Sequence, residues 1–181
     1  MRIKWVLLYL LLAPLVAQAA LMAGRVLQND RPGALEVSGD CRVRYHSGDG
    51  WLKSPVVPDC LALNETPEVL RRMLIFQEDQ AFYDHRGYSL REIYMSLRDY
   101  LFRNRRLRGA STITQQLART LFLSRDRTLR RKFIELRLAR MLEERLSKDR
   151  ILRLYLNQVY WGAAEPGLAV AARAYYGVPS S

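Results

Sequence analysis

The segment Arg108–Leu123, RGASTITQQLARTLFL, contains side chains whose types and spacing could bind a polar ligand. Three hydroxyl groups occur between Ser111 and Thr114, and two consecutive carboxamides follow at Gln115 and Gln116. Ser111 is placed to cap a helix, and the free N–H groups of a first helical turn also attract anions. On chemistry alone this is a binding site for a polyhydroxylated or phosphorylated ligand. A capped surface helix is the alternative interpretation.

A pair of acidic residues, Glu78 and Asp79, ends a predicted helix. Thr66 as N-cap and Pro67 at the first helical position start this helix. A carboxylate at the C-terminal end of a helix, near aromatic residues such as Phe82, is suited to general acid or base work. We expect Glu78 to lie in a cleft, partly desolvated beside Phe82. A solvated acidic pair in a loop is the alternative.

Further helices must position these groups. A capping box at residues 89–92 starts one, and residues 125–146 have the pattern of a long amphipathic helix. Glu135 lies four residues after Arg131 on this helix, so the two can pair on one face. Ser147 caps a last predicted helix, residues 149–159. The pattern therefore predicts a mainly α domain.

The 181-residue chain carries a formal charge of +11, and the excess lies in its second half. Residues 98–153 contain 17 Lys and Arg against 6 Asp and Glu, whereas the rest of the chain is balanced. A basic face can meet nucleic acid, anionic lipid or a phosphorylated substrate, and charge alone does not choose among them. The length suffices for one domain with its own hydrophobic core.

The N-terminal residues predict export. From Trp5 to Gly24 there is no charged residue, and as a helix this stretch would be about 30 Å long, the thickness of a bilayer's hydrocarbon core. Arg2 and Lys4 then mark the cytoplasmic side. We favour a membrane anchor over residues 1–27; a signal peptide cleaved after an A-x-A site at residues 17–19 is the alternative. Either interpretation argues against nucleic acid as a partner.

Residues 28–64 are interpreted as a linker with a short β-hairpin. Apolar and charged residues alternate from Cys41 to His46, and a turn with two glycines follows at 47–50. Cys41 and Cys60 are the two cysteines of the chain. In an oxidising compartment they could close a loop of about 20 residues, which would stabilise the fold by about 3 kcal/mol through chain entropy. Two free buried thiols are the alternative.

Five segments together resemble the motifs of the peptidoglycan glycosyltransferases, found as the transglycosylase module of class A penicillin-binding proteins and as separate monofunctional enzymes. In chain order they are EDQAFYDHRGYSL, RGASTITQQLARTLFL, RRKFIE, SKDRILRLYLNQVYWG and AARAYYG. Their order and spacing also match the family. On this resemblance, residues 65–181 form a glycosyltransferase domain with a mainly α, lysozyme-like fold that lies against the membrane.

The resemblance implies an inverting enzyme on the periplasmic side of the inner membrane. It would polymerise lipid II into β-1,4 glycan strands and release undecaprenyl pyrophosphate. Glu78 matches the catalytic base that takes the proton from the acceptor's 4-hydroxyl, and Glu135 matches the second catalytic carboxylate, near the donor's pyrophosphate. The matched substrate-binding positions are Asp79, Phe82, His85, Ser111, Thr112, Gln115, Gln116, Arg119, Arg127, Arg131, Lys132 and Asn157.

The chemistry agrees with these roles, because a pyrophosphate leaving group needs cations and guanidinium groups bind its oxygens in a fork. No residues are assigned as metal ligands, and the sequence leaves open whether Mg²⁺ or Mn²⁺ assists Glu135. The expected partners are lipid II, the growing glycan strand, inner-membrane lipids and cell-wall synthase proteins.

Several positions depart from the family's pattern. Arg119-Thr120 stands where Lys-Asn is usual, and Ala110, Arg153 and Tyr88-Ser89 replace a Gly, a Glu and an apolar-Asp pair. The family's domain normally continues with further helices, whereas here the domain is shortened after the fifth motif, so we expect uncovered apolar surface over residues 168–176. Two hypotheses follow: a membrane-anchored monofunctional peptidoglycan glycosyltransferase, or a catalytically weak accessory protein that binds lipid II or a synthase.

Overall fold

The computed structural model describes residues 34–177, except for residues 48–49, 55–56, 58, 90, 92–93, 96–97, 99–110 and 124–128. The predicted membrane anchor therefore lies outside the described residues, as does most of the helix expected after Ser89. Within the described ranges, no helix is long and apolar enough to cross a bilayer.

A three-stranded antiparallel sheet precedes the helices. Its strands are β1 (Leu35–Val37), β2 (Val43–Ser47) and β3 (Gly50–Lys53), in the order β1-β2-β3. The hairpin β2–β3 confirms the prediction, and its register places His46 opposite Trp51. Strand β1 was not predicted, because three residues are too few to establish an alternating pattern.

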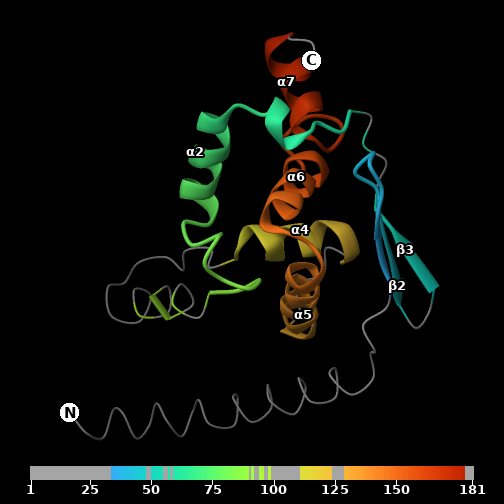
Figure 1. Cartoon of the computed structure of the whole chain (residues 1–181), viewed down its shortest axis with the longest axis vertical. Helices are drawn as coiled ribbons and strands as arrows, with labels where there is room; N and C mark the ends of the chain where they lie inside the picture. The colour runs from blue at the N-terminus through green and yellow to red at the C-terminus, as the bar shows by residue number, and fades with distance from the viewer. Residues whose placement is uncertain are drawn as a thin grey trace, which may run out of the picture.

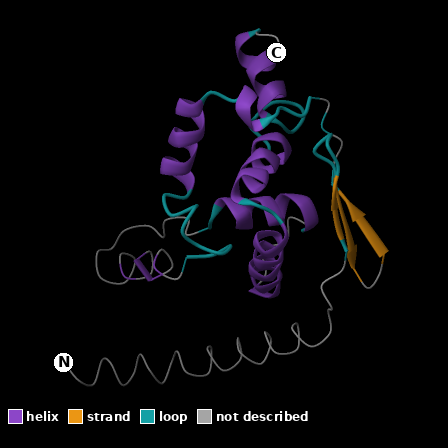
Figure 2. Ribbon diagram, viewed as in Figure 1, coloured by secondary structure: helices purple, strands orange, loops and turns teal. Residues whose placement is uncertain are grey.

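The helices form the main body of the molecule, with the sheet on one side (Figure 2). In chain order they are the 3-10 turn η1 (Leu63–Glu65), α2 (Glu68–Glu78), α4 (Ile113–Phe122), α5 (Leu129–Arg145), α6 (Lys148–Gln158) and α7 (Leu168–Tyr176). Helix α4 lies across one end of α6 and also contacts α5 (Figure 1). The prediction of a mainly helical domain is confirmed.

The hydrophobic core lies where α4, α5 and α6 meet. Leu117 of α4, Leu142 of α5 and Ile151 of α6 are fully buried. Burying one such side chain stabilises a fold by about 1.5–3 kcal/mol. Helix α6 is buried on most of its surface from Ile151 to Gln158, so it is the central helix of the domain.

Two helix caps differ by one residue from the sequence prediction. Pro67, and not Thr66, precedes the first residue of α2, because Thr66 ends the turn η1. Thr112, and not Ser111, caps α4: its backbone is extended and its hydroxyl accepts from Gln115 N at 3.1 Å. Ser147 caps α6, as predicted. The shift at α4 leaves the Ser111 hydroxyl available for other contacts.

A disulfide between Cys41 and Cys60 confirms the predicted pairing, with 5.7 Å between the two Cα atoms. Arg153 of α6 reaches this loop: its guanidinium donates to Leu61 O at 3.1 Å and to Gly39 O at 3.0 Å. Arg153, one of the residues that depart from the family's pattern, therefore fastens the central helix to the disulfide loop.

Exposed apolar residues gather on two helices. On α2, Val69, Met73 and Phe76 are 64–72 % exposed although their spacing suits a buried stripe. On α7, Tyr175 and Tyr176 are exposed, as expected from the sequence, whereas Ala169 and Ala171 are buried.

Candidate active site

Glu78, the last residue of α2, carries an exposed carboxylate. Its Oε2 accepts a hydrogen bond from Gln116 Nε2 at 2.9 Å, so the base candidate contacts the carboxamide segment at the start of α4. The expectation of a partly desolvated carboxylate is wrong, because Glu78 is exposed. Phe82, the aromatic residue expected beside it, is fully buried in the core.

Asp79, unlike its exposed neighbour Glu78, is buried. Its Oδ2 accepts from His85 Nε2 at 2.8 Å and from the backbone N–H of Ile113 at 3.0 Å. The side chains of Asp79 and His85 are 2 % and 6 % exposed. These charge-assisted bonds join the end of α2 to the start of α4, and so fix where Glu78 stands.

Beneath this pair lies a buried polar network that sequence reasoning missed. Glu143 of α5 accepts from Thr114 Oγ1 at 2.6 Å and from Lys148 Nζ at 2.8 Å. Its side chain is 5 % exposed and lies 3.9 Å from His85 Nδ1. No local sequence signal distinguishes Glu143 from a solvated helix residue, since its partners come from three other segments.

Gly87 lets the first motif pass close to α5. Its φ is +96°, and a Cβ there would lie 3.0 Å from backbone atoms of Ala139. Only glycine fits this position without a shift of α5. The carbonyl of Gly87 in turn accepts from Thr112 Oγ1 at 2.7 Å, which anchors the cap of α4.

A second cluster surrounds Lys132 of α5. Its ammonium group donates to Ser111 Oγ at 3.0 Å, Gln115 Oε1 at 2.9 Å and Glu135 Oε1 at 2.5 Å. Three acceptors match the three N–H donors of a lysine, so the cation is held in one place. Its side chain is nevertheless 41 % exposed, which leaves it open to an anion from solvent.

Glu135 is the buried partner of Lys132, with 0 % exposure. The expected pairing with Arg131 is replaced by this pair, three residues apart on the helix. Among the described residues, Glu135 Oε2 has no hydrogen-bond partner. A buried carboxylate oxygen left unbonded is costly, because its lost hydration is not replaced.

The two consecutive glutamines connect these clusters. Gln115 contacts Lys132, and Gln116 contacts Glu78. Because neighbouring residues of a helix point in directions about 100° apart, the first turn of α4 presents one amide to each cluster. A carboxylate and a held cation therefore stand on either side of one helical turn.

The other predicted positions are placed as follows. Arg119 is half-buried near Tyr155; burial raises the pKa of the Tyr155 hydroxyl, and the Arg119 charge opposes that rise. Arg131 is half-buried on α5, and Arg127 lies outside the described residues. Asn157 is not brought to the clusters: it donates to Leu61 O at 3.0 Å and accepts from Leu61 N at 2.8 Å, so its amide holds the disulfide loop.

The described residues include no group of three or more His, Cys, Asp and Glu side chains placed to hold a metal ion. Glu135 is the carboxylate of the Lys132 cluster, and its Oε1 already contacts an ammonium group. Glu135 alone, paired with an ammonium group, does not make a site for a resident divalent cation.

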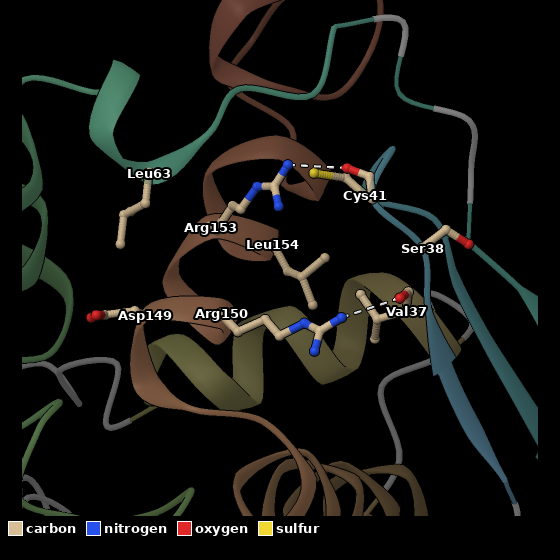
Figure 3. Close-up of a pocket in the computed structure, with 9 residues that line it drawn as sticks. Val37, Ser38, Cys41, Leu63, Asp149, Arg150, Arg153 and Leu154 are labelled. Carbon is tan, nitrogen blue, oxygen red and sulfur yellow. Dashed lines mark hydrogen bonds between the residues drawn. The ribbon is translucent and has the colours of Figure 1, made fainter.

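A cavity of about 260 Å³ lies elsewhere, between α6 and the turn that joins β1 to β2. Arg150 and Arg153 reach across it from α6, and Arg150 donates to Val37 O at 3.2 Å (Figure 3). Both guanidinium groups thus fasten α6 to β1 and to the turn that follows it, and the cavity is not lined by Glu78, Gln116 or Lys132. We assign it a structural role.

Comparison with known proteins places the chain in a family. A family model described as Transglycosylase matches residues 51–181. The biosynthetic peptidoglycan transglycosylases of Nitrosomonas eutropha and Burkholderia cenocepacia are 43 % and 46 % identical over 112 residues, which is 62 % of this chain and 46 % of each relative. Penicillin-binding protein 1A of Escherichia coli is 44 % identical over 117 residues, 65 % of this chain and 14 % of the relative. The chain thus spans less than half the length of these relatives.

Proposed function

Since the chain belongs to the transglycosylase family, we propose that it is a peptidoglycan glycosyltransferase that polymerises lipid II. The observation that carries this proposal is the pairing of groups about α4: an exposed carboxylate, Glu78, on Gln116, and a held ammonium, Lys132, on Gln115. A transfer that displaces a pyrophosphate needs a base on one side and a cation on the other.

In the proposed reaction Glu78 acts as general base. The acceptor's 4-hydroxyl oxygen attacks the anomeric carbon of the donor and forms the new glycosidic bond, while its proton passes to the Glu78 carboxylate. The bond from the anomeric carbon to the pyrophosphate breaks, and the electron pair leaves with the pyrophosphate. Attack opposite to the leaving group inverts the anomeric centre. Gln116 orients the carboxylate through the bond from Nε2 to Oε2.

Lys132 stabilises the leaving pyrophosphate in this proposal. The partly exposed ammonium is fixed by Ser111, Gln115 and Glu135, so little reorganisation is needed when charge develops on the phosphate oxygens. Arg119, Arg127 and Arg131 are proposed to add guanidinium contacts to the same group. Glu135 orients Lys132 by accepting one of its three hydrogen bonds.

We further propose that residues 1–27 anchor the protein in the inner membrane, with the catalytic domain on the periplasmic side. The uncharged run from Trp5 to Gly24 supports the anchor. The disulfide between Cys41 and Cys60 supports an oxidising compartment. If so, the protein stays in the membrane fraction at high salt with its N-terminal residues intact; a soluble chain that begins at Ala20 would show cleavage instead.

Polymerisation of labelled lipid II by the purified full-length chain tests the proposed function. Glycan strands in gel or chromatographic assays would support the enzyme. Saturable lipid II binding without glycan products would refute the enzyme and support an accessory role.

A further inference from the structure

A hydrogen-bonded chain of three side chains ends at Glu78. Tyr155 of α6 donates its hydroxyl to Gln116 Oε1 at 3.0 Å, and Gln116 Nε2 donates to Glu78 Oε2 at 2.9 Å. The two ends differ in environment, since Tyr155 is 3 % exposed and Glu78 is exposed. The chain thus connects the buried central helix to the surface carboxylate.

The direction of the donors follows from the chemistry of the groups. An ionised carboxylate only accepts, so the NH₂ of Gln116 must face Glu78 and its carbonyl must face Tyr155. The tyrosine hydroxyl is then obliged to donate. If that hydroxyl is removed, nothing in this arrangement retains the Gln116 carbonyl, and the amide is free to turn away from Glu78.

Tyr155 is held more firmly than the residues it orients. Its ring packs edge-on against Trp161, with ring centroids 5.9 Å apart, and Trp161 Nε1 donates to Leu156 O at 3.1 Å. On the opposite face of α6, Asn157 fixes the helix to Leu61. The hydroxyl position is therefore set by the core and not by the substrate.

The charges about Tyr155 favour its protonated form. Burial raises the pKa of the hydroxyl, the carboxylates of Glu78 and Asp79 raise it further, and the guanidinium of Arg119 opposes them. The hydroxyl remains a donor throughout the neutral range, as the chain of bonds requires.

We propose that Tyr155 is a positioning residue for the base: through Gln116 it holds the Glu78 carboxylate in the orientation from which it takes the acceptor's proton. This inference rests on the proposed function of Glu78. It assigns a catalytic consequence to a buried residue of α6 that does not reach the exposed carboxylate itself.

The test measures kcat and KM for polymerisation of labelled lipid II by the full-length chain and its variants. Tyr155→Phe removes only the hydroxyl, and we expect kcat to fall about tenfold, equivalent to about 1.4 kcal/mol, with little change in KM. Tyr160→Phe is the matched control, because Tyr160 lies just after α6 with 64 % exposure. It should keep the wild-type kcat.

A double-mutant cycle distinguishes this positioning effect of Tyr155 through Gln116, here called the relay, from a general loss of packing. In a Gln116→Ala background the chain is already broken, so Tyr155→Phe should change kcat by less than about twofold. An equal loss in both backgrounds, or a change in KM alone, would overturn the relay.

A second readout is independent of turnover. Carbodiimide couples glycine ethyl ester to exposed carboxylates, and peptide mass spectrometry measures the extent of coupling at Glu78. This extent should differ several-fold from wild type in Tyr155→Phe and in Gln116→Ala, but not in Tyr160→Phe. Equal labelling in all proteins would refute the relay. If the wild type and Tyr160→Phe make no glycan, the proposed function fails, and the labelling result still decides the relay.

Discussion

Replacement of Asp79 by alanine should destabilise the whole domain, although Asp79 lies next to the proposed catalytic base. The substitution removes the acceptor for His85 Nε2 and for Ile113 N, at 2.8 Å and 3.0 Å, and leaves both donors buried. Breaking a buried pair by removing one partner costs about 3–5 kcal/mol. For a protein of this size each kcal/mol lowers Tm by about 2–4 °C, so we expect a decrease of about 6–20 °C.

The assay is thermal unfolding of the purified full-length protein in detergent, followed by circular dichroism. Arg72→Ala is the control, because it breaks an ion pair with Glu68 on the neighbouring helix α2 whose side chains are 80 % and 63 % exposed. An exposed pair of this kind contributes about 0.3–0.5 kcal/mol, or a shift of at most about 2 °C. If the two variants unfold at the same temperature, the pair of Asp79 and His85 does not support the fold, and the argument for how Glu78 is positioned is wrong.

Three further predictions concern other groups. Glu78→Gln keeps the shape of the side chain but removes the base, so lipid II polymerisation should fall by at least about 100-fold with lipid II binding little changed; a near-wild-type rate would exclude Glu78 as the base. Replacing both Cys41 and Cys60 by serine should lower the free energy of unfolding by about 3 kcal/mol. The urea midpoint should fall, and it should fall equally for the wild type in reductant. An unchanged midpoint would show that the disulfide does not constrain the unfolded chain. The folded-state pKa of Tyr155 is raised above its ordinary value of 10.0, so its contribution to stability is complete below that pH and is lost as pH rises above it. Between pH 8.5 and 11, Tyr155→Phe should therefore lose less unfolding free energy than wild type in urea titrations; equal losses would contradict the raised pKa.

Some of this structure was determined by local sequence and was predicted from it. Ser147 caps α6 because a hydroxyl beside an amphipathic run satisfies free N–H groups whatever surrounds it. The alternation of apolar and charged residues from Cys41 to His46 reflects only the two-residue period of a strand, and the hairpin predicted from it is confirmed. Glu78 lies at the end of α2, as the helical pattern before it predicted.

Other features depend on contacts between distant residues, which no local pattern encodes. Ser111 and Thr112 are adjacent hydroxyls, and only the bond from Thr112 to Gly87 O decides which of them caps α4 and which meets Lys132. Glu143 and Tyr155 acquire their roles from partners 29 and 39 residues away in the chain. The sequence alone determined which groups with the required chemistry are present. The packing of α4 against α5 and α6 decided which of them meet, because hydrogen bonds form only where burial has already brought the two segments together.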